Sequence, residues 1–155
     1  MARWHYRDAA LLWLFVPAYL AHLGEEFFAG FPDWIRLIVG RPLPMTAFIA
    51  INAVALCLLI AAVRTAIRRE SAGWMAVAIA AIVTLNALLH LLGSFATGTY
   101  SPGLITGVVL YLPLGQLTLL RAWHQQAPSA FARGVAVGVF IHAVVAAVAF
   151  AATRA

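Results

Sequence analysis

The stretch Tyr19–Gly30, YLAHLGEEFFAG, places His22 and the adjacent Glu25 and Glu26 at the end of a long apolar run. An ionised carboxylate that faces hydrocarbon is costly, so it must pair with a metal ion, a proton or a protonated imidazole. Helices that pack as a bundle can bring such groups to one point. The stretch therefore predicts a helix that belongs to a bundle and turns its polar side chains inward.

The composition of the chain indicates an integral membrane protein. Of its 155 residues, 65% are hydrophobic and 10% are charged, and the mean hydropathy is +0.96. A soluble domain of this length would expose too much apolar surface, and the size suits a single membrane domain over residues 1–155. The net charge of +5 does not indicate nucleic-acid binding, because the arginines lie between apolar runs and form no basic face with interleaved aromatic residues.

Five apolar segments are each about 20 residues long, which is enough to cross a hydrocarbon core of about 30 Å. Proline residues stand at the entrance to the second, fourth and fifth, where proline sacrifices no helical hydrogen bond. We therefore predict an all-α bundle of five transmembrane helices, with a short interfacial segment, FPDWIRLIVGRP (31–42), between the first two. The predicted spans are residues 9–29, 44–67, 72–95, 102–123 and 131–151.

The positions of the arginines predict the orientation in a cytoplasmic (plasma) membrane. With the N-terminus inside, seven arginines lie on the inner side and three on the outer side, as the positive-inside rule favours. The inner group is Arg3, Arg7, Arg64, Arg68, Arg69, Arg121 and Arg133, and the outer group is Arg36, Arg41 and Arg154. An odd number of spans then places the C-terminus outside, with membrane lipid as the surrounding partner.

The polar residues inside the predicted spans concentrate in the outer half of the bundle. Residues three or four apart share a helix face, so His22 and Glu26 on the first span and His90 on the third can point to one place. Bundle cores build metal sites from carboxylates and imidazoles in this way. The sequence therefore predicts a divalent metal, zinc or iron, whose ligands are His22, Glu26, His90 and, from the middle of the fifth span, His142.

The two adjacent glutamates are expected to have different roles, because they are separated by about 100° around the helix. We expect Glu26, which shares the i, i+4 row with His22, to bind the metal. We expect Glu25 to serve as a general base on bound water or to support the ligands, so both glutamates are candidate catalytic residues. The N-terminus of the fourth span has free N–H groups that suit a phosphate or carboxylate head group. Residues expected to contact the substrate or to support the ligands are Asn52, Asn86, Tyr100, Pro102 and Gly103.

Three short motifs resemble those of the HXXEE family of small multispanning membrane proteins. They are HLGEE at 22–26, NALLH at 86–90 and SPG at 101–103, and their order matches over most of the chain. The family pattern has a threonine after the Pro-Gly pair, whereas this chain has Leu104 there and Thr106 two residues later. The resemblance implies no activity. It implies site positions at His22, Glu25, Glu26, Asn86, His90, Pro102 and Gly103.

Three functional hypotheses follow from these residues. The first is a metal-dependent enzyme that hydrolyses or oxidises a lipid or another amphiphile in the outer half of the bundle. The second is a small transporter in which the glutamates and histidines carry protons. The third is a non-catalytic scaffold in which the same groups hold helices together. The spacing of Gly134 and Gly138 also permits close helix contact, so a homo-oligomer is an expectation.

Overall fold

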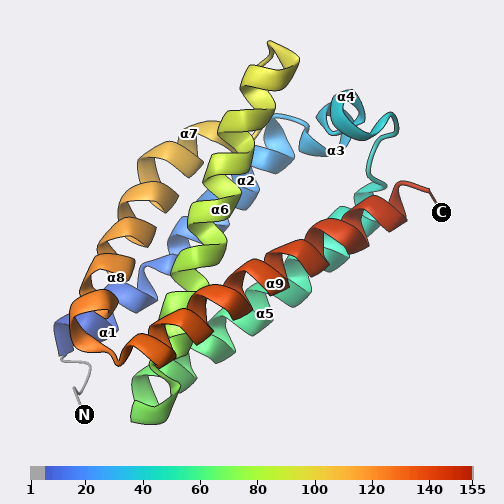
Figure 1. The fold of residues 1–155 in the computed structure, drawn as a ribbon. Coiled ribbons are helices and arrows are strands. Elements are labelled where there is room, and N and C mark those ends of the chain that lie inside the picture. Colours follow the sequence, from blue (N-terminus) through green and yellow to red (C-terminus); the bar gives the residue numbers. More distant parts are fainter. Residues whose placement is uncertain (1–5, 155) are drawn as a thin grey trace.

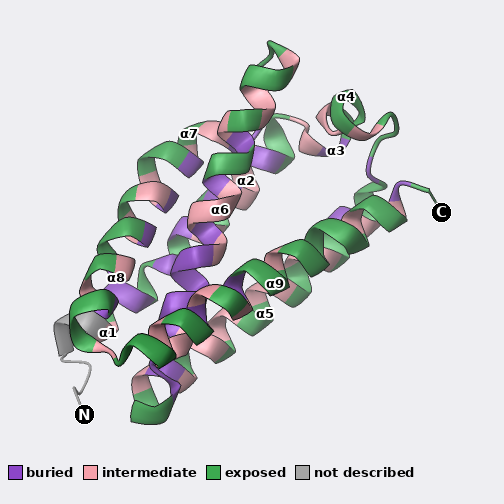
Figure 2. Cartoon of the chain, in the orientation of Figure 1, coloured by how far each residue is buried: buried purple, intermediate pink, exposed green. Residues whose placement is uncertain are grey.

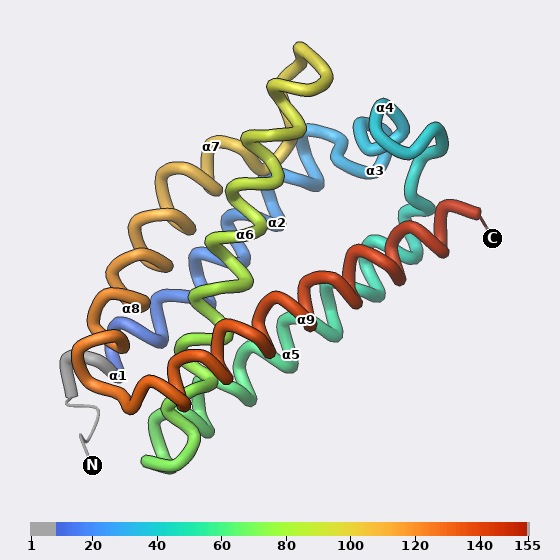
Figure 3. Tube along the Cα trace, in the orientation of Figure 1, coloured from blue at the N-terminus to red at the C-terminus, as the bar shows by residue number. Residues whose placement is uncertain are grey.

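The structure, a computed structural model, describes residues 6–154, and these residues form helices and no strand. The long helices alternate in direction along the bundle (Figures 1 and 3). The elements are α1 (Tyr6–Trp13), α2 (Phe15–Phe28), α3 (Phe31–Trp34), α4 (Arg36–Val39), α5 (Met45–Arg68), a 3-10 turn (Glu70–Ala72), α6 (Trp74–Thr97), α7 (Leu104–Thr106), a π-helical turn (Gly107–Tyr111), α8 (Leu112–Gln125) and α9 (Pro128–Ala152).

Four of the described helices are long and apolar enough to cross a membrane, as judged by length and composition. They correspond to the second to fifth predicted spans, and the predicted count of five is not confirmed. The first predicted span is divided at Leu14 into α1 and α2, neither of which has the required length. Pro17 explains the division, because it has no N–H to donate to the carbonyl of Trp13.

Helix α6 lies at the centre of the bundle and has the most buried residues of any described helix (Figure 2). It contacts α5, α8 and α9. Small residues allow the closest of these contacts. A Cβ atom added at Gly134 of α9 would lie 2.5 Å from Val77 Cβ, and one added at Gly138 would lie 2.7 Å from the Ala78 carbonyl oxygen. The glycines that we expected to permit helix contact therefore pack within the chain, and a homo-oligomer stays a prediction.

The arginines lie near the ends of the helices, so alternating helix directions place them at the two ends of the bundle. The α8–α9 turn meets the α5–α6 turn, because Gln126 Nε2 donates to the Gly73 carbonyl at 3.1 Å. At the opposite end, Arg41 and Arg154 line one surface hollow. Arg3 lies outside the described residues. The orientation of these ends relative to a membrane stays a prediction.

The segment between α2 and α5 folds back over the end of α6. Trp34 of α3 donates its indole N–H to Thr99 Oγ1 at 3.0 Å, and its ring occupies the space where a side chain at Gly93 would lie. The Leu43 N–H donates to the Pro32 carbonyl at 2.8 Å, which closes the segment on itself. Two short helices thus form where we predicted an interfacial segment, and they cover one side of the loop that precedes α7.

Candidate metal centre

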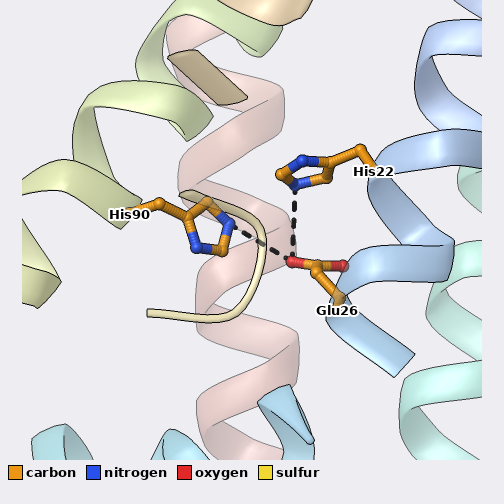
Figure 4. Close-up of side chains that lie close together, drawn as sticks. All are labelled: His22, Glu26 and His90. Carbon is orange, nitrogen blue, oxygen red and sulfur yellow. Dashed lines mark ion pairs between the residues drawn. The ribbon is translucent and has the colours of Figure 1, made fainter. Parts of the chain in front are cut away.

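Three buried side chains from two helices converge at one point (Figure 4). His22 and Glu26 share a face of α2, one turn apart, and His90 projects from α6. Glu26 Oε1 lies 3.6 Å from His22 Nε2 and 3.3 Å from His90 Nε2. His22 is 3% exposed, Glu26 is 7% exposed and His90 is 5% exposed. Two imidazoles and a carboxylate are therefore brought together away from water.

Hydroxyl groups on the chain around α7 orient both imidazoles. The Nδ1 atom of His22 lies 2.8 Å from Thr106 Oγ1, and that of His90 lies 3.0 Å from Ser101 Oγ. The Thr106 hydroxyl donates to the Gly103 carbonyl, so we assign it as the acceptor of the His22 Nδ1–H. This tautomer leaves the lone pair of His22 Nε2 facing Glu26. Metal-binding histidines are held in the same way by a partner on the far ring nitrogen.

The backbone at Gly103 lies directly against the two imidazole rings. A Cβ atom added there would lie 2.7 Å from His90 Cε1 and 2.8 Å from His22 Cε1. Its φ of +101° is in the left-handed region that side chains disfavour. Ser101 and Pro102, which precede it, are also fully buried. Glycine is therefore required by conformation and by space, and the segment 101–103 covers the centre.

Glu25 does not join the three converging groups and binds Gly103 of the covering segment and the residues on either side of that segment instead. Its Oε1 accepts from the N–H groups of Gly103 and Ile105 at 3.1 and 2.9 Å. Its Oε2 accepts from the Thr106 N–H at 2.7 Å, and the Tyr100 hydroxyl donates to Oε1. The N–H groups at the start of the fourth span, which we expected to hold a head group, are thus occupied by Glu25. That expectation was wrong, because the Glu25 carboxylate already accepts hydrogen bonds from these N–H groups.

A π-helical turn brings one further aromatic ring to the centre. Tyr111, at the end of this turn, stacks on His22 with a centroid distance of 4.4 Å. Pro113 lacks the N–H that would bond to the Val109 carbonyl, which accounts for the irregular turn. On the other side, the ring of Phe31 lies 5.6 Å from that of His90. The two imidazoles are therefore fixed by ring packing as well as by hydrogen bonds.

Comparison with known families shows that the converging residues lie within a matched family region. A family model described as a protein of unknown function with HXXEE motif matches residues 13–118. The chain belongs to the HXXEE family. Comparisons with curated proteins and with solved structures found no match. The matched residues run from the end of α1 into α8, and they include both histidines of the centre, both glutamates and the segment 101–106.

The three motifs that the resemblance identified all reach the centre, but not through every residue. The HXXEE motif supplies His22 and Glu26 to the converging group and Glu25 to the segment above it. In the second motif His90 joins the group, whereas Asn86 lies one turn away with a buried Oδ1 that has no hydrogen-bond partner among the described residues. In the third motif Gly103 touches both rings. Although Leu104 stands directly after the Pro-Gly pair, the hydroxyl of Thr106 lies 2.8 Å from His22 Nδ1.

Asn52 and His142, which were also predicted for the site, lie outside the converging group as well. Asn52 accepts the Tyr19 hydroxyl at 2.6 Å and donates to the Phe48 carbonyl at 2.9 Å, so it links α2 to α5. His142 is half-buried on α9, beyond the residues that the HXXEE model matches, and it is not among the three residues whose ligand atoms lie close together. Its role as a fourth ligand stays a prediction.

Three residues of the centre were missed or left open by sequence reasoning. Ser101 and Thr106 flank the Pro-Gly pair and orient the imidazoles, and Tyr111 stacks on His22. The signal that was available is the pair of hydroxyl residues placed on either side of Gly103, because a histidine ligand needs an acceptor for its second nitrogen. No comparable signal marks Tyr111, since its position depends on the π-helical turn.

Proposed function

We propose that this protein is a metal-dependent membrane enzyme whose metal is held by His22, Glu26 and His90. The metal-bound water would attack a lipid or another amphiphile, so that an ester or amide bond is hydrolysed. Three protein ligands and one open position are the usual composition of a catalytic zinc site. The same two-histidine, one-carboxylate set also suits non-haem iron. We favour hydrolysis because it needs no reactant besides water.

The observation that carries the proposal is the spacing of the three ligand atoms. A tetrahedral site with bonds of about 2.0–2.1 Å separates its ligands by about 3.3–3.4 Å. The distances of 3.6 and 3.3 Å from Glu26 Oε1 to the two imidazole nitrogens match this separation. His22 Nε2 is buried and has no hydrogen-bond partner among the described residues. A cation between a carboxylate and two imidazole lone pairs satisfies all three groups at once.

The roles of the two glutamates follow from their contacts. The Glu26 carboxylate would help to hold the metal and would also accept a proton from the water activated there. A metal held by these residues would supply the Lewis acidity that lowers the pKa of water toward neutral. Both oxygens of Glu25 accept backbone N–H groups. We therefore assign Glu25 to positioning the covering segment, in preference to the role of general base.

The surroundings of the centre favour an amphiphilic substrate. Apolar side chains are exposed on both elements that flank it, including Phe28 of α2 at 87% and Ile105 of α7 at 60%. In a membrane these surfaces contact acyl chains. The covering segment 101–103 separates the centre from the surface, so the substrate would reach the metal when this segment moves aside.

The decisive experiment is elemental analysis of protein purified without a metal-affinity tag. We expect a near-stoichiometric divalent metal in the natural chain and its loss in His22→Ala, Glu26→Gln and His90→Ala. His124→Ala is the matched control, because it removes an exposed histidine at the end of α8 that was not predicted to bind the metal, and it should retain the metal. Cobalt substitution gives a second measurement, since four-coordinate cobalt has an intense visible spectrum. Retention of metal by both His22→Ala and His90→Ala would refute the centre.

Activity assays then separate the enzyme from its alternatives. An enzyme should cleave members of a panel of lipid esters and amides, and Glu26→Gln should abolish turnover. A proton-coupled transporter should instead support flux driven by a pH gradient in metal-free liposomes. A chain that binds metal and shows neither turnover nor flux would contradict the catalytic proposal while leaving the metal centre in place.

A further inference from the structure

A basic groove lies at the end of α5 that leads into the α5–α6 turn. None of the residues that line it belongs to the metal centre. The volume of the groove is about 550 Å³. One half is lined by Cys57, Ile60 and Ala61, and the other by three arginines. The arginines are Arg64, Arg68 and Arg69. Cys57, Ile60, Ala61, Arg64 and Arg68 recur every three or four positions and therefore share one face of the helix, and Arg69 follows directly after its end.

The described residues place no acidic side chain against the arginines of this groove. Residues 64–70 contain three arginines and a single acidic residue, Glu70. The three arginines are exposed, and they form no ion pair with another residue of the described chain. A topology signal needs arginines only in the loop. Here Arg64 lies within the helix, one turn before Arg68, where it borders apolar side chains.

The length and polarity of the groove match a phospholipid. A rise of about 1.5 Å per residue places Arg68 about 16 Å along the helix axis from Cys57. The apolar half continues toward the exposed Val54 and Leu58. An acyl chain can therefore follow the helix while a phosphate meets the guanidinium groups. Arginine forms paired hydrogen bonds with phosphate oxygens, which favours it over lysine at such a position.

We propose that this groove binds an anionic phospholipid. The phosphate lies among Arg64, Arg68 and Arg69, and one acyl chain packs along Ile60 and Ala61. Basic clusters at the ends of transmembrane helices bind anionic head groups. The apolar half of the groove selects a lipid over free phosphate, because phosphate would leave that half uncovered. The proposal does not depend on the metal centre.

Cys57 provides a reporter for the test, because it is the single cysteine, is exposed and lines the groove. A fluorophore on Cys57 in detergent micelles is titrated with brominated phosphatidylglycerol or brominated phosphatidylcholine of the same acyl chains. We expect stronger quenching by phosphatidylglycerol, weakening as salt is raised. We expect the double variant Arg64→Gln, Arg68→Gln to lose at least about 10-fold of this preference.

The double variant Arg36→Gln, Arg41→Gln is the matched control, since it removes two exposed charges from the opposite end of the bundle. It should keep the preference. Native mass spectrometry of unlabelled protein checks that the label does not create the site, and it should show retained phosphatidylglycerol. Equal quenching by the two lipids in the natural chain would overturn the proposal. Equal loss in both double variants would also overturn it, because net charge alone would then explain the preference.

Discussion

Glycine approaches helix α6 at several levels, and two of these contacts have different purposes. On its first half, Gly134 and Gly138 of α9 meet backbone and aliphatic atoms of α6. On its second half, Gly103 meets the imidazole rings of His90 and His22. The first contact allows two helices to pack. The second allows a backbone segment to lie against two buried imidazole rings.

The two contacts serve different properties of the molecule: the contact at Gly134 serves stability, and the contact at Gly103 serves the candidate metal centre. Around Gly134 the neighbours are an aliphatic side chain and a backbone carbonyl, and the absence of a side chain lets the two helices pack closely. Around Gly103 the neighbours are polar, and Ser101 and Thr106 supply the hydrogen bonds that the buried rings require. A change in the first contact should therefore alter stability alone, whereas a change in the second should alter metal binding first.

The largest effect on metal binding is expected from Gly103→Ala. The new methyl group would lie within 3 Å of both imidazole rings, which would displace at least one of them. We expect metal affinity to fall by about 100-fold, as measured by competition with a chromophoric chelator. Gly98→Ala is the matched control, because Gly98 also has positive φ, at +64°, but a Cβ atom there would meet nothing within 4 Å. Equal losses in the two variants would show that backbone strain, and not contact with the rings, is responsible.

Gly134→Ala should break the other contact. Its methyl group would meet Val77 Cβ at 2.5 Å and the Trp74 carbonyl oxygen at 2.6 Å, and a backbone atom cannot move aside cheaply. We expect the free energy of unfolding to fall by about 1–3 kcal/mol, measured by denaturation in mixed micelles. The metal content of the folded fraction should not change. Gly24→Ala, where a Cβ atom meets nothing within 4 Å, should be neutral or stabilising.

The same contrast explains which parts of the molecule the sequence could predict. The apolar runs and prolines predicted the four long helices closely, since span length and helix starts are local properties. The pairing of His22 with Glu26 on one face also follows from helix geometry. The division at Leu14 was harder to foresee. Pro17 indicated a bend, but whether a bent helix still spans a membrane depends on its neighbours.

The role of Glu25 could not be predicted, because it depends on contacts between distant segments. Its hydrogen-bond partners lie 75 to 81 residues away along the chain. Helix geometry separates Glu25 from Glu26 by direction, but it does not show that a loop lies on the Glu25 side. For His142, its depth in a predicted span suggested a metal ligand. Whether its side chain reaches the centre depends on how α9 packs, which the sequence does not show.

Glu25→Gln tests whether the covering segment depends on a charged anchor. Glutamine keeps the size but presents an NH₂ group where the carboxylate accepts N–H groups from both sides. We expect metal affinity to fall by about 10-fold, mainly through faster dissociation, because the segment above the metal is released. Asp33→Asn makes the same chemical change at an exposed acidic residue and should have no effect. An unchanged dissociation rate in Glu25→Gln would contradict the positioning role.

Tyr100→Phe is the mildest of these changes, because it removes one of the hydrogen bonds to Glu25. We expect a loss of a few-fold in metal affinity, in line with about 1 kcal/mol for a single hydrogen bond. Burial, and then the hydrogen bond to the Glu25 carboxylate, raise the pKa of Tyr100 from 10.0 to about 12. The stability that this hydroxyl contributes is therefore complete below pH 10 and is lost as the pH rises toward 12.

The difference in ultraviolet absorption between the natural chain and Tyr100→Phe isolates the titration of this one tyrosine. Its midpoint should lie near the raised value in the natural chain. In the Glu25→Gln background the midpoint should move toward the ordinary value, although not fully, because burial also raises the pKa of Tyr100. A midpoint near 10 in both backgrounds would mean that Tyr100 does not contact Glu25 in solution, and the segment above the metal would then be anchored by backbone N–H groups alone.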